Sequence, residues 1–205
     1  MHKQTHNVPV IGLYADARQS GKTTAALIIQ DILAAHGWPS QSLAFAAALK
    51  RGACAFLEAF GLTDADATRY IYEDKDTIIP GLGRTGREFL VKLGTDCGRE
   101  FVHPLCWVRG WKRKAEKNIK DRKATVCDDV RMHDEAQAVR DLGGVVIEIR
   151  RPERLRRMGS SPVDARTEGL LPSCTNHVVI NDGTLGQLKI RLTQALIDAQ
   201  VIKRK

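Results

Sequence analysis

The segment from residue 8 to residue 35 restricts the fold more than any other part of the sequence. An apolar, partly β-branched run, Val8–Tyr14, is followed by a loop that ends in Ser20-Gly21-Lys22-Thr23-Thr24 and then by a helix-like stretch to Ala35. A strand, a Gly-Lys-Thr loop and a helix in this order are typical of a phosphate-binding loop. The segment therefore predicts an α/β protein that binds a nucleoside triphosphate.

The residues of this loop have distinct expected tasks. Gly21 stands where a side chain would collide with a phosphate. Lys22 supplies a positive charge for the β and γ phosphates, and Thr23 offers a hydroxyl to Mg²⁺. The pattern G-x-x-x-x-G-K-[ST] also requires glycine at residue 16, where this chain has Asp16. The sequence leaves open whether that carboxylate points outward or accepts a hydrogen bond from the loop.

Apolar segments alternate with helical ones along the rest of the chain, which predicts parallel strands joined by helical crossovers. The expected strands are Val8–Tyr14, Ser42–Phe45, Ala124–Cys127, Val145–Ile149 and Val178–Ile180. The expected helices are Lys22–Ala35, Ala47–Phe60, Gly86–Leu93, Arg109–Lys123, His133–Leu142 and Leu185–Ala199. Two long segments, Thr63–Arg84 and Arg151–Cys174, do not fit the alternation and are typical of functional or mobile loops.

The composition narrows the function classes. The net charge of +8 is compatible with nucleic acid or with a phosphorylated small substrate. The basic run Lys112–Lys123 has no interleaved aromatic residue, so a solvated helix face is favoured over a single-strand-binding surface. The five scattered cysteines form no C-x-x-C pair and are expected to be free thiols. We expect a soluble, cytosolic protein without a membrane span.

A pair of carboxylates follows the strand expected at Ala124–Cys127. In phosphate-loop proteins an acid at the end of a neighbouring strand holds Mg²⁺ directly or through water. Asp128 and Asp129 are both candidates, and periodicity does not separate them because neighbouring residues of a strand face opposite sides. The alternative is an ordinary strand that ends in acidic turn residues.

Further blocks accompany the phosphate loop in a fixed order. They are Ala44-Phe45-Ala46-Ala47-Ala48-Leu49-Lys50-Arg51, Thr85-Gly86-Arg87-Glu88-Phe89-Leu90, Leu93-Gly94-Thr95-Asp96-Cys97-Gly98-Arg99, His103-Pro104 with Trp107-Val108, Asp129-Val130-Arg131-Met132-His133-Asp134-Glu135-Ala136, Gly143-Gly144 through Ile149-Arg150-Arg151-Pro152, and Val179-Ile180-Asn181-Asp182-Gly183. In these blocks the chain resembles the deoxynucleoside monophosphate kinases of tailed bacteriophages, from about residue 10 to residue 195. It departs from their pattern at Asp16, at Ala47-Ala48 and at Asn176.

The resemblance implies a three-layer phosphate-loop kinase fold with a five-stranded parallel sheet in the order 2-3-1-4-5. Residues 1–205 would form a single kinase domain, with a helical monophosphate-binding insertion at residues 47–110 and an arginine-rich lid at residues 151–174. The implied reaction moves the γ-phosphoryl group of ATP to a (deoxy)nucleoside monophosphate, with Mg²⁺ as cofactor. The expected location is the cytoplasm, of the host if the origin is a phage. Nucleic acid and membrane are not expected partners, and a homodimer is compatible with the resemblance.

The resemblance also assigns roles to individual residues. Lys22, Arg131 and Arg151 would be catalytic, because cations can neutralise charge on the transferring group. The ATP-binding residues would be Ser20, Gly21, Lys22, Thr23, Thr24, Asn181 and Gly183, the last two beside the adenine. The substrate-binding residues would be Lys50, Arg87, Thr95, Asp96, Arg99 and Trp107, where guanidinium groups grip phosphate oxygens and the indole stacks on the base. Thr23 and Asp129 would hold Mg²⁺.

Three alternatives remain at this level. The chain could be a nucleoside triphosphatase or nucleotide-binding module that acts on nucleic acid through its positive charge. It could be a kinase for another small acceptor, such as a metabolite alcohol. It could also be a degenerate relative in which Asp16 blocks ATP.

Overall fold

A computed structural model describes residues 8–15, 19–152 and 175–204. Asp16 and residues 153–174 of the expected lid lie outside this described part. The chain folds as two compact units, which we call the sheet unit (residues 1–44 and 112–205) and the inserted unit (residues 45–111). The inserted unit begins two residues before, and ends one residue after, the insertion expected at residues 47–110.

A parallel sheet organises the sheet unit. Its strands are β1 (Val10–Tyr14), β2 (Ser40–Ser42), β5 (Ala124–Cys127), β6 (Val145–Arg150) and β7 (His177–Ile180). They are arranged in the order β2-β5-β1-β6-β7, which is 2-3-1-4-5 when only these strands are counted along the chain. Ile11 in the middle strand is paired with Val126 on one side and Val145 on the other. The α/β class with a five-stranded parallel sheet is therefore confirmed.

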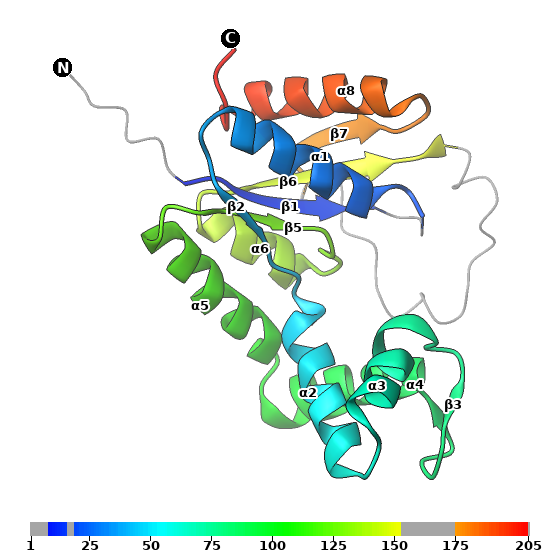
Figure 1. The fold of residues 1–205 in the computed structure, drawn as a ribbon. Coiled ribbons are helices and arrows are strands. Elements are labelled where there is room, and N and C mark those ends of the chain that lie inside the picture. The colour runs from blue at the N-terminus through cyan, green and yellow to red at the C-terminus, as the bar shows by residue number, and fades with distance from the viewer. Residues whose placement is uncertain (1–7, 16–18, 153–174, 205) are drawn as a thin grey trace. The chain divides into compact units, whose positions relative to one another are not determined.

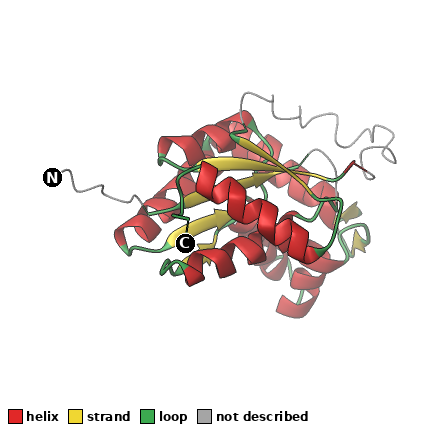
Figure 2. Ribbon diagram, turned by 90° about the horizontal axis from the view of Figure 1, so that it is seen from above, coloured by secondary structure: helices red, strands yellow, loops and turns green. Residues whose placement is uncertain are grey.

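Helices cover both faces of this sheet. Helices α1 (Lys22–Ala35) and α8 (Leu185–Asp198) lie on one face, and α6 (His133–Asp141) lies on the other (Figure 1). Seen from above, α1 and α8 run side by side across the strands (Figure 2). Helix α5 (Cys106–Lys120) begins in the inserted unit and continues into the sheet unit. Within the described residues, no helix is both long enough and apolar enough to cross a membrane.

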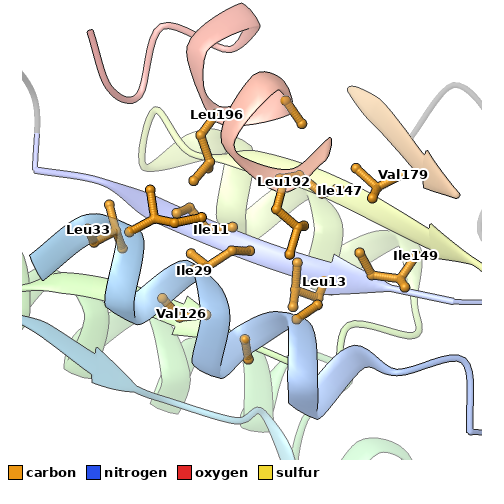
Figure 3. Close-up of a cluster of buried hydrophobic side chains, with 14 of the residues drawn as sticks. Ile11, Leu13, Ile29, Leu33, Val126, Ile147, Ile149, Val179, Leu192 and Leu196 are labelled. Atoms are coloured by element: carbon orange, nitrogen blue, oxygen red, sulfur yellow. The ribbon is translucent and has the colours of Figure 1, made fainter. Parts of the chain in front are cut away.

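The main core fills the layer between α1, α8 and the sheet (Figure 3). Ile11 and Leu13 alternate along β1 toward the helices, and Ile29 and Leu33 return from α1 at helical spacing. Each of these four side chains is fully buried. Burial of one such side chain stabilises a fold by roughly 1.5–3 kcal/mol. The strand that leads to the phosphate loop and the helix that follows it are thus held in place by the same core.

The inserted unit is mostly helical. It contains α2 (Ala46–Ala59), α3 (Asp64–Thr68), the π-helix η1 (Arg69–Glu73), the short hairpin β3 (Ile78–Ile79) and β4 (Arg84–Thr85), α4 (Gly86–Lys92) and the π-helix η2 (Leu93–Val102). A small core around Leu57, Ile71 and Ile79 joins α2, η1 and the hairpin. The segment 63–84 has no clear apolar periodicity in its sequence, but in the structure it contains short regular elements.

One strand boundary differs from the sequence prediction. The strand expected at Ser42–Phe45 is β2 at Ser40–Ser42. One of the apolar residues that led to the later position is buried by a contact outside the sheet. The ring of Phe45, at the start of α2, stacks on Trp111 with 4.4 Å between ring centroids.

Candidate active site

The phosphate loop ends in a left-handed turn at Gly21. The residue has φ of 94° and forms the N-cap of α1, so the helix begins at Lys22. A side chain is strained in this backbone region, which explains the glycine. The first backbone N–H groups of a helix have no partner within the helix, and the helix dipole adds partial positive charge there. The start of α1 therefore offers backbone N–H groups and partial positive charge, the features that suit an anion.

A hydroxyl and a carboxylate meet beside this helix start. The Thr23 Oγ1 hydroxyl donates a hydrogen bond of 3.0 Å to Asp128 Oδ2, across 105 residues of sequence. Asp128 follows β5, which lies next to β1 in the sheet. The connection after β1 leads to α1 on one face, and the connection after β5 leads to α6 on the other (Figure 1). Ligands of open α/β sheets bind where neighbouring connections diverge in this way.

Asp129, the acid assigned to Mg²⁺ by the resemblance, has a different contact. The Cys127 Sγ thiol donates a hydrogen bond of 3.2 Å to Asp129 Oδ1. Burial raises the pKa of the Cys127 thiol well above its usual value, which keeps it protonated as a donor. The structure thus brings Asp128, and not Asp129, to the hydroxyl of Thr23.

The arginines expected to be catalytic lie after β5 and β6. Arg131 is exposed, and its backbone N–H donates to Glu135 Oε2 at 2.8 Å, which fixes the turn into α6. Arg151 follows the end of β6 and is half-buried. Its neighbour Arg150 makes a two-pronged contact of 2.7 and 3.0 Å with the buried Glu148 on the same strand face.

The connection between β7 and α8 also reaches the phosphate loop. The Asn181 Nδ2 amide donates a hydrogen bond of 2.9 Å to the carbonyl oxygen of Ser20. Gly183 lies just before Thr184, which caps α8 together with Gln187. Lys22 is half-buried, and Thr24 is exposed on the first turn of α1. All the expected ATP-binding residues therefore lie in the sheet unit.

The expected acceptor residues all lie in the inserted unit, where most of them have partners within that unit. Arg87 grips Asp76 through two hydrogen bonds of 2.7 and 2.9 Å. Asp96 pairs with Lys92 at 2.5 Å, and Arg99 donates to the carbonyl oxygen of Pro104 at 3.2 Å. Of the other three, Lys50 has its Nζ 5.2 Å from the centre of the Tyr72 ring, Thr95 is half-buried in η2, and Trp107 packs against η2.

Trp107 supports the η2 helix. Its indole N–H donates a hydrogen bond of 2.8 Å to the carbonyl oxygen of Gly94. A Cβ on Gly98 would stand 2.5 Å from the indole nitrogen and 2.7 Å from two ring carbons. The indole is thus packed against the helix that carries Thr95, Asp96 and Arg99. The geometry gives Trp107 a supporting contact, and its expected stacking on the acceptor base stays a prediction.

The packing of Trp107 on Gly98 gives a first testable prediction. Gly98→Ala is expected to cost about 1–3 kcal/mol of unfolding free energy, because the new methyl group must displace an anchored indole. Since η2 carries expected acceptor residues, KM for the monophosphate should rise more than KM for ATP. Thermal unfolding and steady-state kinetics measure both effects.

Gly110→Ala is the matched control in the same unit. A Cβ at Gly110 meets nothing within 4 Å, and the residue lies inside α5. Alanine there should be neutral or stabilise the helix by up to about 1 kcal/mol. Equal behaviour of the two variants would refute the importance of the indole contact.

The comparison with known families decides the enzyme class. The model of the family described as deoxynucleotide monophosphate kinase matches residues 67–192, which is more than half of the chain. The chain belongs to this family. It is a kinase that acts on a monophosphate, and the family supports ATP as the phosphoryl donor. No curated protein sequence matches the kinase.

A solved structure supports the type of fold. The kinase is similar to the APS kinase CysC of Mycobacterium tuberculosis in complex with AMPPNP and APS, with 12% identity, 95% and 98% of the two chains covered and a TM-score of 0.50. It also matches dephospho-CoA kinase from Campylobacter jejuni, with 13% identity, 95% and 98% coverage and a TM-score of 0.48. At such identities the likeness concerns the fold alone.

Two contacts of the kinase have no clear signal in the sequence. Asp76 holds Arg87 from eleven residues away, but it stands in a segment with several other acids. The Asn181 contact with Ser20 joins residues 161 positions apart. A third contact involves the neighbour of the predicted residue: the Asp-Val-Arg block favoured Asp129 as the partner of Thr23 at the magnesium site, whereas Asp128, directly before it, contacts Thr23.

Proposed function

We propose that this kinase transfers the γ-phosphoryl group of ATP to a deoxynucleoside monophosphate and releases the diphosphate, in an Mg²⁺-dependent reaction. The observation that carries the proposal is the contact between Thr23 and Asp128 at the start of α1. It places a hydroxyl and a carboxylate, two oxygen donors of the kind Mg²⁺ prefers, beside a helix N-terminus suited to phosphate. The family match supplies the monophosphate as the second substrate.

The donor side of the reaction is assigned to the sheet unit. The backbone N–H groups from Gly21 to Thr24 surround the β and γ phosphates, and Lys22 adds a positive charge there. Thr23 and Asp128 are the residues that would hold Mg²⁺, which neutralises phosphate charge when bound. Arg131 and Arg151 are assigned to the charge that develops on the transferring group. Of the two residues that the resemblance places beside the adenine, Gly183 is proposed to contact the nucleoside of ATP.

The acceptor side is assigned to the inserted unit. Arg87 and Arg99 are proposed to bind the monophosphate, because a guanidinium group forms paired hydrogen bonds with phosphate oxygens. The pairing of Arg87 with Asp76 holds that guanidinium in one orientation in the free protein. Thr95 and Asp96 are proposed to contact the sugar or base.

Several finer attributes follow from the resemblance and are part of the proposal. They are a bacteriophage origin, a location in the host cytoplasm, and a homodimer. A lid formed by residues 151–174 is proposed to close over the donor, since exclusion of water directs the phosphoryl group to the acceptor.

The reaction can be tested directly. Purified enzyme is incubated with ATP and Mg²⁺ and, in turn, each common ribo- and deoxyribonucleoside monophosphate, and ADP formation is coupled to NADH oxidation. We expect turnover with at least one deoxynucleoside monophosphate, at about 1–100 s⁻¹ as is typical of kinases. ADP formation that does not depend on any monophosphate, in folded protein, would contradict the proposal.

A further inference from the structure

One side chain attaches the connection between β7 and α8 to the phosphate loop. The hydrogen bond from Asn181 Nδ2 to the Ser20 carbonyl oxygen is 2.9 Å long. Ser20 is only 1% exposed, so water has little access to compete for its carbonyl group. The contact acts on the peptide unit that leads into the left-handed Gly21.

The orientation of this peptide determines what the loop offers to a ligand. The C=O and N–H groups of a trans peptide unit point in opposite directions. A bond that holds the Ser20 carbonyl toward Asn181 therefore points the N–H of Gly21 in the opposite direction, away from Asn181. This N–H is one of the donors expected to face the phosphates. Asn181 thus acts on a phosphate-binding group without contacting the nucleotide.

The close approach of Asn181 also restricts residue 21. A Cβ at Gly21 would lie 2.5 Å from Asn181 Nδ2, well inside the contact distance of two heavy atoms. A side chain at residue 21 would thus have to displace this amide, in addition to adopting the strained backbone angle of +94°. A side chain at residue 21 would therefore compete with the Asn181 amide for its place beside the loop.

Asn181 is itself fixed by its surroundings. Its backbone N–H donates to the carbonyl oxygen of Arg150 at 2.8 Å. Arg191 on α8 donates to the carbonyl oxygen of Ile180 and, at 2.6 Å, to Asp182 Oδ1. This hydrogen bond from Arg191 lowers the pKa of the Asp182 carboxyl, so the pair is ionised at neutral pH. Both neighbours of Asn181 are therefore tied to α8, which holds the backbone that carries its amide.

We propose that Asn181 is a positioning residue for the phosphate loop, and that Arg191 holds it in place. Its amide keeps the peptide between Ser20 and Gly21 in the orientation that binds a polyphosphate. The proposal rests on the proposed function only in that the loop binds the phosphates of ATP. It differs from the contact with adenine that the resemblance implies for Asn181, because a residue that positions the loop affects every ligand with a phosphate chain.

Two ligands separate these roles. Dissociation constants for ATP and for inorganic tripolyphosphate, each with Mg²⁺, are measured by calorimetry on the wild type, Asn181→Ala and Asn181→Asp. We expect both variants to bind both ligands about tenfold more weakly, a loss comparable with that of one ordering hydrogen bond. Hydrogen exchange at the loop amides should become faster in both variants, and KM for the monophosphate should stay near the wild-type value.

Asn176→Ala is the matched control. The Asn176 Oδ1 oxygen accepts a hydrogen bond of 2.9 Å from the Val146 backbone N–H at the other end of β7. The control therefore loses one side-chain-to-backbone hydrogen bond of the same strand without touching the phosphate loop. Its affinities for ATP and tripolyphosphate should equal those of the wild type. If Asn181→Ala does not fold, Arg191→Lys replaces it, with a loss of about threefold expected because lysine keeps the charge without the guanidinium fork.

Three results would overturn the proposal. They are a loss of affinity for ATP with tripolyphosphate unaffected, unchanged affinity for both ligands in folded variants, and an equal loss in Asn176→Ala. The first would make Asn181 an adenine contact, and the last would reduce its role to general stability. The binding measurements that decide these three results need no acceptor, so a failure of the proposed reaction is seen separately, in the wild-type assay.

Discussion

Replacing Lys22 with alanine is expected to lower kcat/KM for ATP about 10³-fold, the largest effect of any single substitution proposed for this kinase. Lys22 is the first residue of α1 and directly follows the left-handed Gly21. Its ammonium group is assigned to the β and γ oxygens, where negative charge is held and redistributed during transfer. Alanine is a good helix former, so α1 should persist in the variant. Steady-state kinetics at saturating monophosphate give the measurement, with circular dichroism and thermal unfolding as tests of folding.

A second lysine controls for the loss of one positive charge from the sheet unit. Lys112 on α5 pairs with Asp141 at 3.3 Å, and both side chains are partly exposed. Such pairs contribute little, roughly 0–1 kcal/mol, so Lys112→Ala should retain the wild-type kcat/KM. If Lys22→Ala kept more than about a tenth of the wild-type activity, a loss of under 1.4 kcal/mol, the loop would not carry the role assigned to it.

The elements that present the phosphate loop could be predicted because each carries a local signal. Helix α1 and strand β5 have the residue bounds expected from the sequence, Lys22–Ala35 and Ala124–Cys127. The helix begins at the Gly-Lys step and repeats apolar residues at helical spacing, and the strand is a short run buried on both faces. Their types and limits follow from these local signals.

Elements without such a signal were misplaced or missed. Strand β2 lies at the edge of the sheet, and its residues Ser40-Gln41-Ser42 are polar. The sequence prediction therefore placed the strand on the apolar residues that follow. The hairpin strands β3 and β4 have two residues each, too few for an alternating pattern. Strand β2 is determined by its pairing with β5, far along the chain, whereas the hairpin strands pair with each other across a short turn.

The same limit applies to the site. The sequence identified Thr23 and two adjacent carboxylates, but only the packing of β5 beside β1 decides which of them reaches Thr23. Adjacent residues at a strand end face opposite sides, so Asp128 and Asp129 cannot both make that contact. The structure turns one toward the hydroxyl and the other toward the thiol of Cys127.

This difference between the two carboxylates leads to the second large prediction. Asp128→Asn should lower kcat about 10²-fold at a fixed Mg²⁺ concentration, while Asp129→Asn should have a clearly smaller effect. Asparagine at 128 still offers an oxygen to the Thr23 hydroxyl, so the local structure should survive, but it lacks the charge that attracts a divalent cation. The ratio of ATP dissociation constants measured with EDTA and with Mg²⁺ should therefore fall toward one in Asp128→Asn and stay as in the wild type in Asp129→Asn.

The paired design makes either outcome informative about the site. Both substitutions remove one negative charge and keep the side-chain shape, so a difference between them cannot come from net charge or packing. Thr23→Ser, which keeps the hydroxyl that donates to Asp128, should retain the Mg²⁺ dependence, and Thr23→Ala should lose part of it. If Asp129→Asn instead lost the Mg²⁺ effect, the acid of the Asp-Val-Arg block would be the ligand. The Thr23–Asp128 hydrogen bond would then be a contact of the free enzyme that nucleotide binding has to replace.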